Sequence, residues 1–320
     1  MAAQMASNRL ILDTDGGVDD AQALLLLIAA GRVPSAVTTV HGNVDLEHAT
    51  RNMLDTLAVA GAAVPVHAGA AQALVQERVH ARHVHGEDGL GGAPRPSRTA
   101  DVASSDAVGF LVSTLEDAAA TGDRVDLLMI GPLTNLALAL RRAPGITRGI
   151  GQLTIMGGTV YGRGNVTPVA EFNIFCDPEA AAIVFGVAAD TVVVPWEPCL
   201  AHVLSGADID RMFAGVPDSP YKAFSHALVQ HDRKRHVQAG KDDCFYFIDP
   251  FAAAVVVEPD IVTKSTRGSV QVTLEPDDRR GMTIVDPSGR AGAPMARLVE
   301  QARLDRLAAL YAASVAYVPT

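Results

Sequence analysis

Short apolar segments of this chain are each followed by a polar or glycine-rich turn and then by a helix-like segment. Alternation of this kind is typical of a mostly parallel sheet covered by helices. We therefore predict an α/β fold in which a mostly parallel central sheet is flanked by helices. The strand-like segments lie at residues 10–12, 36–40, 125–130, 153–156 and 191–194.

The turns after these strands are the expected place for a ligand site, because ligands of parallel α/β sheets bind beyond the carboxyl ends of the strands. Polar residues gather in several of these turns. The turns that we expect to lie together span residues 13–20, 41–43, 131–135 and 156–173.

No linker, repeat or low-complexity tract divides the chain, so residues 1–320 are predicted to form a single domain. Residues 69–100 carry few periodic apolar residues and read as one long loop. Loops of this length are uncommon in compact domains and often act as lids, so this segment is predicted to be a mobile active-site loop. Residues 263–285 read as strands or a hairpin, and residues 294–317 as a closing helix.

Charge and composition exclude several classes of function. The chain has 36 acidic against 26 basic residues, a formal charge of −10, so a nucleic-acid partner is not expected. The longest apolar run, residues 23–30, is far shorter than the roughly 20 residues that span a bilayer. The N-terminus does not resemble a secretory signal, and three scattered cysteines suggest neither disulfides nor a zinc site. We expect a cytoplasmic protein without a membrane partner.

The most informative motif is the octapeptide Asp-Thr-Asp-Gly-Gly-Val-Asp-Asp at residues 13–20, between a strand and a helix. Four carboxylates this close repel one another unless they are solvated, protonated or bridged by a cation. Carboxylate oxygens suit Ca²⁺ or Mg²⁺. The alternative is an exposed acidic turn in which Asp19 and Asp20 stabilise the N-terminus of the following helix through its dipole. An EF-hand is excluded, because Leu24 stands where the bidentate Glu is needed.

Two enzyme families share this octapeptide in part. Residues 10–16 resemble the first motif of haloacid-dehalogenase-like phosphatases, which would make Asp13 a nucleophile and Asp15 an acid–base with Mg²⁺ as cofactor. The whole octapeptide resembles the signature Asp-x-Asp-Pro-Gly-x-Asp-Asp of nucleoside hydrolases, although Gly16 stands in place of the family's proline.

Further matches favour the nucleoside hydrolases. The phosphatase motif has no evident counterpart later in the chain, whereas the nucleoside hydrolase segments recur in order from about residue 9 to 260. This resemblance implies a nucleoside hydrolase fold with a Rossmann-like core. The matching segments are His41-Gly42-Asn43, residues 49–52, 85–90, 131–136, 156–158 and 170–180, and Ile248-Asp249-Pro250.

The resemblance implies hydrolysis of the N-glycosidic bond of ribonucleosides to free base and ribose. It further implies a Ca²⁺ cofactor bound by Asp15, Asp20, Asp249 and the main-chain carbonyl of Thr134, which suits the oxygen ligands that Ca²⁺ prefers. Asp15 would be the general base for a calcium-bound water, because cation-bound water loses a proton more readily. Asn43 would help to orient that water.

The resemblance also assigns the sugar-binding residues. Asp19 would hold a ribose hydroxyl, and His85 in the long loop would contact the 5′ side of the sugar. Met156 follows an apolar strand and is equally typical of core packing. The remaining residues implied to grip the ribose are Asn165, Glu171 and Asn173.

Departure of the base is the step for which the sequence offers no obvious residue. Many nucleoside hydrolases have a histidine, linked to protonation of the base, where this chain has Ile248. His231 and His236, on a helix predicted from 221 to 238, are the candidates, with His85 as a third. Stacking by an aromatic residue among 245–247 is another route.

A relative that binds a nucleoside or ribose without turnover is a further alternative, motivated by Gly16 and Ile248. Base specificity is left open among purine, pyrimidine and broader ribosides. By resemblance we expect a homo-dimer or homo-tetramer.

Overall fold

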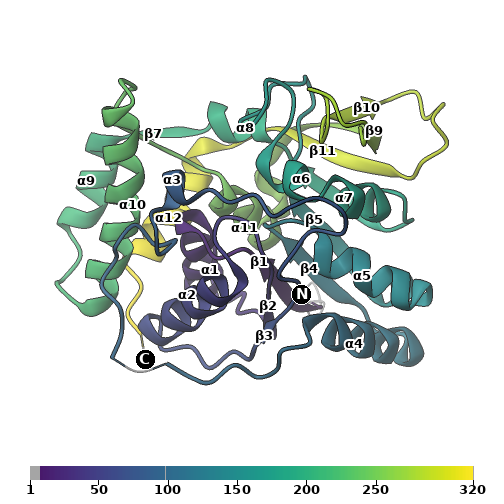
Figure 1. The fold of residues 1–320 in the computed structure, drawn as a ribbon. Helices are drawn as coiled ribbons and strands as arrows, with labels where there is room; N and C mark the ends of the chain where they lie inside the picture. Colours follow the sequence, from purple (N-terminus) through teal and green to yellow (C-terminus); the bar gives the residue numbers. More distant parts are fainter. Residues whose placement is uncertain (1–7, 98, 320) are drawn as a thin grey trace, which may run out of the picture.

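Nine strands form the central sheet of the structure, a computed structural model that describes residues 8–97 and 99–319 (Figure 1). Their order across the sheet is β10-β9-β11-β6-β5-β4-β1-β2-β3. The pairs from β11 to β3 are parallel, and only β9 runs antiparallel to its neighbours β10 and β11. The strands are β1 (Arg9–Thr14), β2 (Ala36–Thr39), β3 (Val66–Ala68), β4 (Val125–Met129), β5 (Ile150–Met156), β6 (Asp190–Val194), β9 (Val262–Val272), β10 (Thr283–Asp286) and β11 (Met295–Ala302).

Helices cover both faces of the sheet, as predicted for an α/β fold. Figure 1 shows α1, α2 and α12 on one side and α4 and α5 on the other. The two short strands β7 (Val203–Ser205) and β8 (Cys244–Tyr246) form a separate antiparallel pair. The α-helices are α1 (Val18–Ala29), α2 (Leu46–Val59), α3 (Arg82–His85), α4 (Ala107–Thr121), α5 (Thr134–Arg142), α6 (Phe172–Cys176), α7 (Pro178–Phe185), α8 (Trp196–Ala201), α9 (Gly206–Ala214), α10 (Pro220–Gln238), α11 (Asp249–Val257) and α12 (Leu304–Val315).

Alternation along the strands divides the core into two layers. Leu10 and Leu12 of β1 pack with residues of α1, α10, α11 and α12 on one face. Ile11 between them packs with residues of α4, α5 and α7 on the other face. Successive side chains of a strand point to opposite faces, so a strand buried on both faces reads as an unbroken apolar run. Burial on both faces thus explains why the central strands carry consecutive apolar residues.

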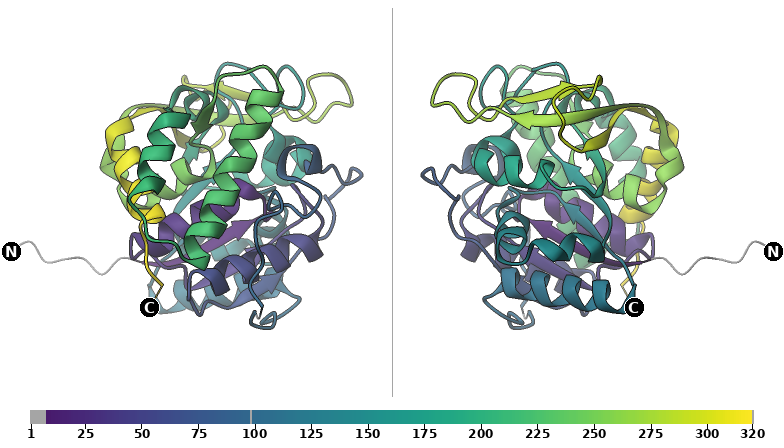
Figure 2. Two further views of the ribbon diagram at one scale, coloured as in Figure 1. Left: turned by 90° about the vertical axis from the view of Figure 1, so that its left-hand side faces the viewer. Right: turned by 90° about the vertical axis from the view of Figure 1, so that its right-hand side faces the viewer.

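The C-terminal region contains a segment whose predicted structure is wrong. Residues 294–317 were expected to be one helix, but residues 295–302 form β11 and only 304–315 form a helix. β11 pairs with β6 on one side and β9 on the other, and this tertiary pairing outweighs the helix-like composition of the segment. The predicted hairpin at 263–285 is confirmed as β9 and β10, and Figure 2 shows it projecting at the upper edge of the molecule.

No helix among the described residues is both long enough and apolar enough to cross a bilayer. The helix predicted at 221–238 is present as α10. In Figure 2, α10 stands beside α9 on the outer side of the domain.

Candidate active site

The four turns expected to lie together follow four neighbouring strands. The octapeptide follows β1, residues 41–43 follow β2, residues 131–135 follow β4, and residues 156–173 follow β5. Because β5, β4, β1 and β2 are adjacent and parallel, their carboxyl ends meet at one edge of the sheet. The strand order thus brings these polar turns to one place.

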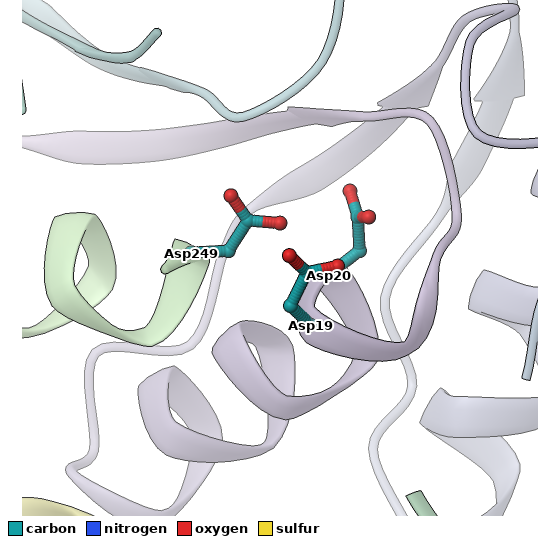
Figure 3. A group of neighbouring side chains, drawn as sticks. All are labelled: Asp19, Asp20 and Asp249. Carbon is teal, nitrogen blue, oxygen red and sulfur yellow. The ribbon is translucent and has the colours of Figure 1, made fainter. Parts of the chain in front are cut away.

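Three carboxylates meet at this edge. Asp19 and Asp20 begin α1, Asp249 begins α11, and one oxygen of each lies within 4.8 Å of the others. Figure 3 shows the three side chains directed into the same space. Burial raises the pKa of Asp249 well above its usual range, and repulsion by the charges of Asp19 and Asp20 raises it further. Burial and the charge of Asp19 likewise raise the pKa of Asp20.

This group has the donor chemistry of a hard-cation site. Every donor is a carboxylate oxygen, and Oδ1 of Asp19 is buried with no hydrogen-bond partner in the part of the chain that the structure describes. A divalent cation would relieve the repulsion that raises these pKa values. Oxygen donors alone suit Ca²⁺ or Mg²⁺ better than a softer metal. The residues present therefore fit the cation that the sequence predicted.

Asp15 lies beside this group and is oriented by the turn after β2. Its two carboxylate oxygens accept hydrogen bonds from the main-chain N–H of Asn43 at 2.7 Å and from Nδ2 of Asn43 at 2.9 Å. The same Nδ2 donates to Oδ2 of Asp20 at 3.0 Å. Gly42 allows this approach, since a Cβ there would overlap the Asp15 carboxylate. Asn43 thus links Asp15 to the acidic group, although Asp15 is not one of the three clustered residues.

Asp13 holds the base of the turn. Its Oδ2 accepts hydrogen bonds from Thr38 Oγ1 at 2.5 Å and from Asn135 Nδ2 at 2.8 Å. Burial raises its pKa to about 7, against the effect of these two hydrogen bonds. The carboxyl of Asp13 therefore ties β1 to β2 and to α5.

Thr134 begins α5 at the same edge. Its hydroxyl donates to Oδ2 of Asp177 at 2.7 Å and lies 3.2 Å from Nε2 of His41. Burial lowers the pKa of His41 to about 4, so this ring is neutral. These contacts fix the start of α5, where the predicted carbonyl ligand is located.

Glu171 and Asn173 close the side of the site formed by β4 and β5. Glu171 caps α6, accepting hydrogen bonds from the N–H groups of Asn173 at 2.9 Å and Gly158 at 2.9 Å. Burial raises its pKa to about 7. Asn173 donates from Nδ2 to the carbonyls of Ile130 at 3.0 Å and Met156 at 3.2 Å.

Two predicted sugar-binding residues differ in exposure. Met156 is buried at the end of β5. Asn165 is exposed in the loop after β5, where its main-chain N–H donates to the carbonyl of Ala170 at 3.1 Å. Asn165 is thus exposed, whereas Glu171 and Asn173 are buried.

The long loop lies directly against the octapeptide. Nδ1 of His85 accepts a hydrogen bond from the N–H of Val18 at 3.1 Å and lies 3.6 Å from Oδ1 of Asp19. Burial lowers the pKa of His85 to about 4, which agrees with a neutral ring that accepts at Nδ1. His85 therefore covers the start of α1 beside Asp19.

The other two candidate histidines are engaged with main-chain carbonyls. His231 donates from Nε2 to the carbonyl of Val84 in the loop, at 2.8 Å. His236 is buried, donates from Nδ1 to the carbonyl of Cys244 at 3.3 Å, and accepts at Nε2 from Arg235 at 3.0 Å.

The aromatic residues proposed for stacking are mostly part of the core. Phe245 and Phe247 are fully buried, and both contact the ring of Tyr311. Tyr246 packs edge-on against His236. Ile248 packs against the same apolar core as the two phenylalanines.

Sequence reasoning did not single out several polar residues of α1, α10 and α12. Asp232 and Arg235 of α10 lie near enough to Asp19 for their charges to interact with it. Gln22 of α1 and Tyr311 of α12 carry buried polar atoms without hydrogen-bond partners among the described residues. A signal for Asp232 existed: it follows Tyr221, Phe224 and Leu228 at helical spacing, on the buried face of α10.

Proteins of known family resemble this chain in sequence and in fold. The family model for inosine-uridine preferring nucleoside hydrolases matches residues 10–309. The non-specific ribonucleoside hydrolase RihC of Salmonella enteritidis is 35% identical over 90% of this chain and 91% of its own. Uridine nucleosidase 1 of Arabidopsis thaliana is 35% identical over 83% of this chain and 79% of its own. A plant nucleoside hydrolase, PpNRh1, superposes with a TM-score of 0.88 at 29% identity, covering 98% of this chain and 100% of its own.

Proposed function

The chain belongs to the inosine-uridine preferring nucleoside hydrolase family and is a ribonucleoside hydrolase acting on N-glycosyl compounds, and we propose that it works with a Ca²⁺ ion and with Asp15 as general base. The observation that carries this proposal is the convergence of Asp19, Asp20 and Asp249, with Asp15 held beside them by Asn43. The products would be free base and ribose, which places the enzyme in nucleoside catabolism and base salvage.

The proposed cation ligands are Asp15, Asp20, Asp249 and the carbonyl of Thr134. When bound, Ca²⁺ supplies positive charge that makes a neighbouring water easier to deprotonate. Asp15 accepts the water proton, because its carboxylate stays within reach of the acidic group while Asn43 fixes its orientation. The hydroxide then adds to C1′ of the ribose as the bond to the base breaks.

Ribose binding is proposed for the residues around this centre. Asp19 holds a ribose hydroxyl, and Glu171 and Asn173 grip the sugar from the side of β4 and β5. His85 reaches the 5′ side from the loop, and Asn165 and Met156 complete the sugar subsite. Contacts to the sugar contribute to catalysis when they strengthen as positive charge develops at C1′. The buried carboxylates near C1′ favour that charge.

The test is a panel of purine and pyrimidine nucleosides assayed for free ribose, with and without a chelator. Release that is lost with chelator and restored by Ca²⁺ supports the proposal. Asp15→Ala and Asp249→Ala should each abolish base release while the circular dichroism spectrum is unchanged, and Asp260→Ala, an exposed acid, is the control. Wild-type rates in either variant contradict the metal and base assignments.

Two further assays separate the alternatives of a phosphatase and of a binding protein that does not turn over its ligand. Phosphate release from phosphomonoesters without base release would favour a phosphatase. Thermal stabilisation by Ca²⁺ and ribose without any product would favour a binding protein. We also propose a homo-dimer or homo-tetramer, which light scattering of the purified protein measures.

A further inference from the structure

The hairpin of β9 and β10 lies against the turn between β5 and α6, which carries Glu171 (Figure 1). This contact joins distant parts of the chain, since Thr159 of the turn and Thr283 of the hairpin are 124 positions apart. Three consecutive hairpin residues, 281–283, make the contact, and we call them the hairpin support. They touch the turn both before and after Glu171.

The carboxylate of Glu171 is held by main-chain N–H groups from two segments. One oxygen accepts a hydrogen bond from Asn173 at 2.9 Å, and the other accepts from Gly158 at 2.9 Å and from Ile174 at 3.2 Å. No side chain within residues 8–97 and 99–319 bonds to this carboxylate. Asn173 and Ile174 belong to the helix that Glu171 caps. The N–H of Gly158 therefore ties the carboxylate to the end of β5.

Thr283 fixes the main chain beside Gly158. Its hydroxyl accepts a hydrogen bond from the N–H of Thr159 at 2.8 Å and donates one to the carbonyl of Thr159 at 2.7 Å. One side chain thus engages both main-chain polar groups of the residue that follows Gly158. Thr283 also packs against Gly158 itself, where an added Cβ would lie 3.0 Å from Cγ2 of Thr283. Because Thr283 is only 3% exposed, water has little access to replace these contacts.

The other two residues of the hairpin support contact the main chain on either side of Glu171. Met282 pairs with Ala170, directly before Glu171, in an antiparallel bridge. Gly281 lies so close to Phe175 that an added Cβ would be 2.9 Å from the Cα of Phe175. The hairpin support therefore contacts the main chain next to both groups of N–H donors that hold Glu171.

We propose that Thr283 is a positioning residue for ribose binding, which acts through Gly158 on the carboxylate of Glu171. This inference rests on the proposed function, in which Glu171 grips the sugar. The hydroxyl of Thr283 holds the turn so that the N–H of Gly158 stays bonded to Glu171 before the sugar arrives. A carboxylate that is already oriented loses little further freedom when the sugar binds, and this favours affinity.

The experiment removes the Thr283 hydroxyl while keeping the shape of the side chain. In Thr283→Val we expect KM for inosine and uridine to rise about tenfold and kcat to change less than about threefold, because a displaced sugar contact weakens substrate binding. Thr283→Ser retains the hydroxyl, and its KM should stay within about twofold of the wild-type value. Ser269→Ala is the control: it removes a buried hydroxyl of the same hairpin that has no hydrogen-bond partner among the described residues, and should leave both constants unchanged.

A double-mutant cycle with Glu171→Gln separates positioning from a general loss of structure. Because Thr283 acts through Glu171, Thr283→Val should raise KM by less than about twofold when Glu171 is already replaced. The full effect of Thr283→Val in that background would overturn the inference. An unchanged KM in Thr283→Val, or an equal rise in Thr283→Ser, would also overturn it.

If Thr283→Val does not fold, Gly281→Ala disturbs the same support through Phe175. Gly292→Ala is its control, since both glycines have positive φ, 78° and 70°, but no described neighbour lies within 4 Å of a Cβ at Gly292. A rise in KM that is no larger in Gly281→Ala than in Gly292→Ala overturns the inference. An active wild type that none of these changes affects refutes the positioning role alone. A wild type that releases no ribose from any nucleoside refutes the proposed function as well.

Discussion

Asn52 of α2 connects the active-site turn to the long loop, and its hydrogen bonds determine the loss of stability that we expect when it is removed. Its Nδ2 donates to the carbonyl of Gly16 at 2.7 Å and to the carbonyl of Asp88 at 2.9 Å. Its Oδ1 accepts from Arg95 at 2.7 Å. The side chain is fully buried, so water cannot replace these partners.

The three contacts do not contribute equally. Arg95 also donates to Asp55 at 2.7 Å and to the carbonyl of Asp88 at 3.2 Å. Arg95 and the Asp88 carbonyl therefore both keep hydrogen-bond partners without Asn52. The carbonyl of Gly16 is buried and depends on Asn52. Loss of two net hydrogen bonds at about 1 kcal/mol each, with one carbonyl left unpaired at about 1–3 kcal/mol, gives about 3–5 kcal/mol for Asn52→Ala.

Urea denaturation followed by circular dichroism measures this free energy of unfolding. Limited proteolysis reports separately on the loop at residues 69–100, which we expect to be cut faster in Asn52→Ala because one of its anchors is gone. Asn52→Asp keeps the acceptor for Arg95 but places a carboxylate against the Gly16 carbonyl, and should be at least as destabilising. Gln72→Ala, an exposed change in the same loop, is the control. A loss below about 0.5 kcal/mol with unchanged proteolysis would refute the reasoning.

Three further predictions concern the site itself. Gly16→Ala should destabilise the protein more than Gly92→Ala in thermal unfolding: both have positive φ, 71° and 73°, but only at Gly16 would a Cβ lie 2.5 Å from Cα of Ala49. Equal losses would contradict this packing argument. Asp249→Asn should abolish the rise in melting temperature that Ca²⁺ produces in the wild type, and an undiminished rise would show that the cation binds elsewhere. Glu171→Ala removes the cap of α6 and should cost about 1–2 kcal/mol and raise KM for ribonucleosides, whereas an unchanged melting temperature would exclude the capping role.

The sequence was informative wherever local pattern decides structure. The strands before the four polar turns were predicted correctly because their apolar runs are buried on both faces of the sheet. A parallel sheet covered by helices on both sides requires such apolar strands. The strand β11 was missed because its identity depends on pairing with β6 and β9, which lie far away in the chain. The composition of this segment alone does not indicate that pairing.

The same distinction between local pattern and long-range contact applies to the residues of the site. Glu171 and Asn173 lie inside the site because a motif of contiguous residues positions them at the end of β5. The resemblance implied Asp15, Asp20 and Asp249 as carboxylate ligands of the cation, and the structure brings Asp19 together with Asp20 and Asp249. The residue at which α1 begins and the hydrogen bonds of Asn43 decide which carboxylates of the octapeptide point toward α11. The spacing of residues in the motif does not determine this.

Gly16 illustrates how a departure from a family signature can be a structural feature and not a loss of function. Proline fixes φ near −65°, whereas Gly16 has a φ of 71°, so the family's proline does not fit this backbone. The carbonyl of Gly16 accepts from Asn52, and the space of its missing side chain is filled by Ala49. Both partners belong to α2. The glycine and the close approach of α2 therefore depend on each other, and neither removes a carboxylate from the group formed by Asp19, Asp20 and Asp249.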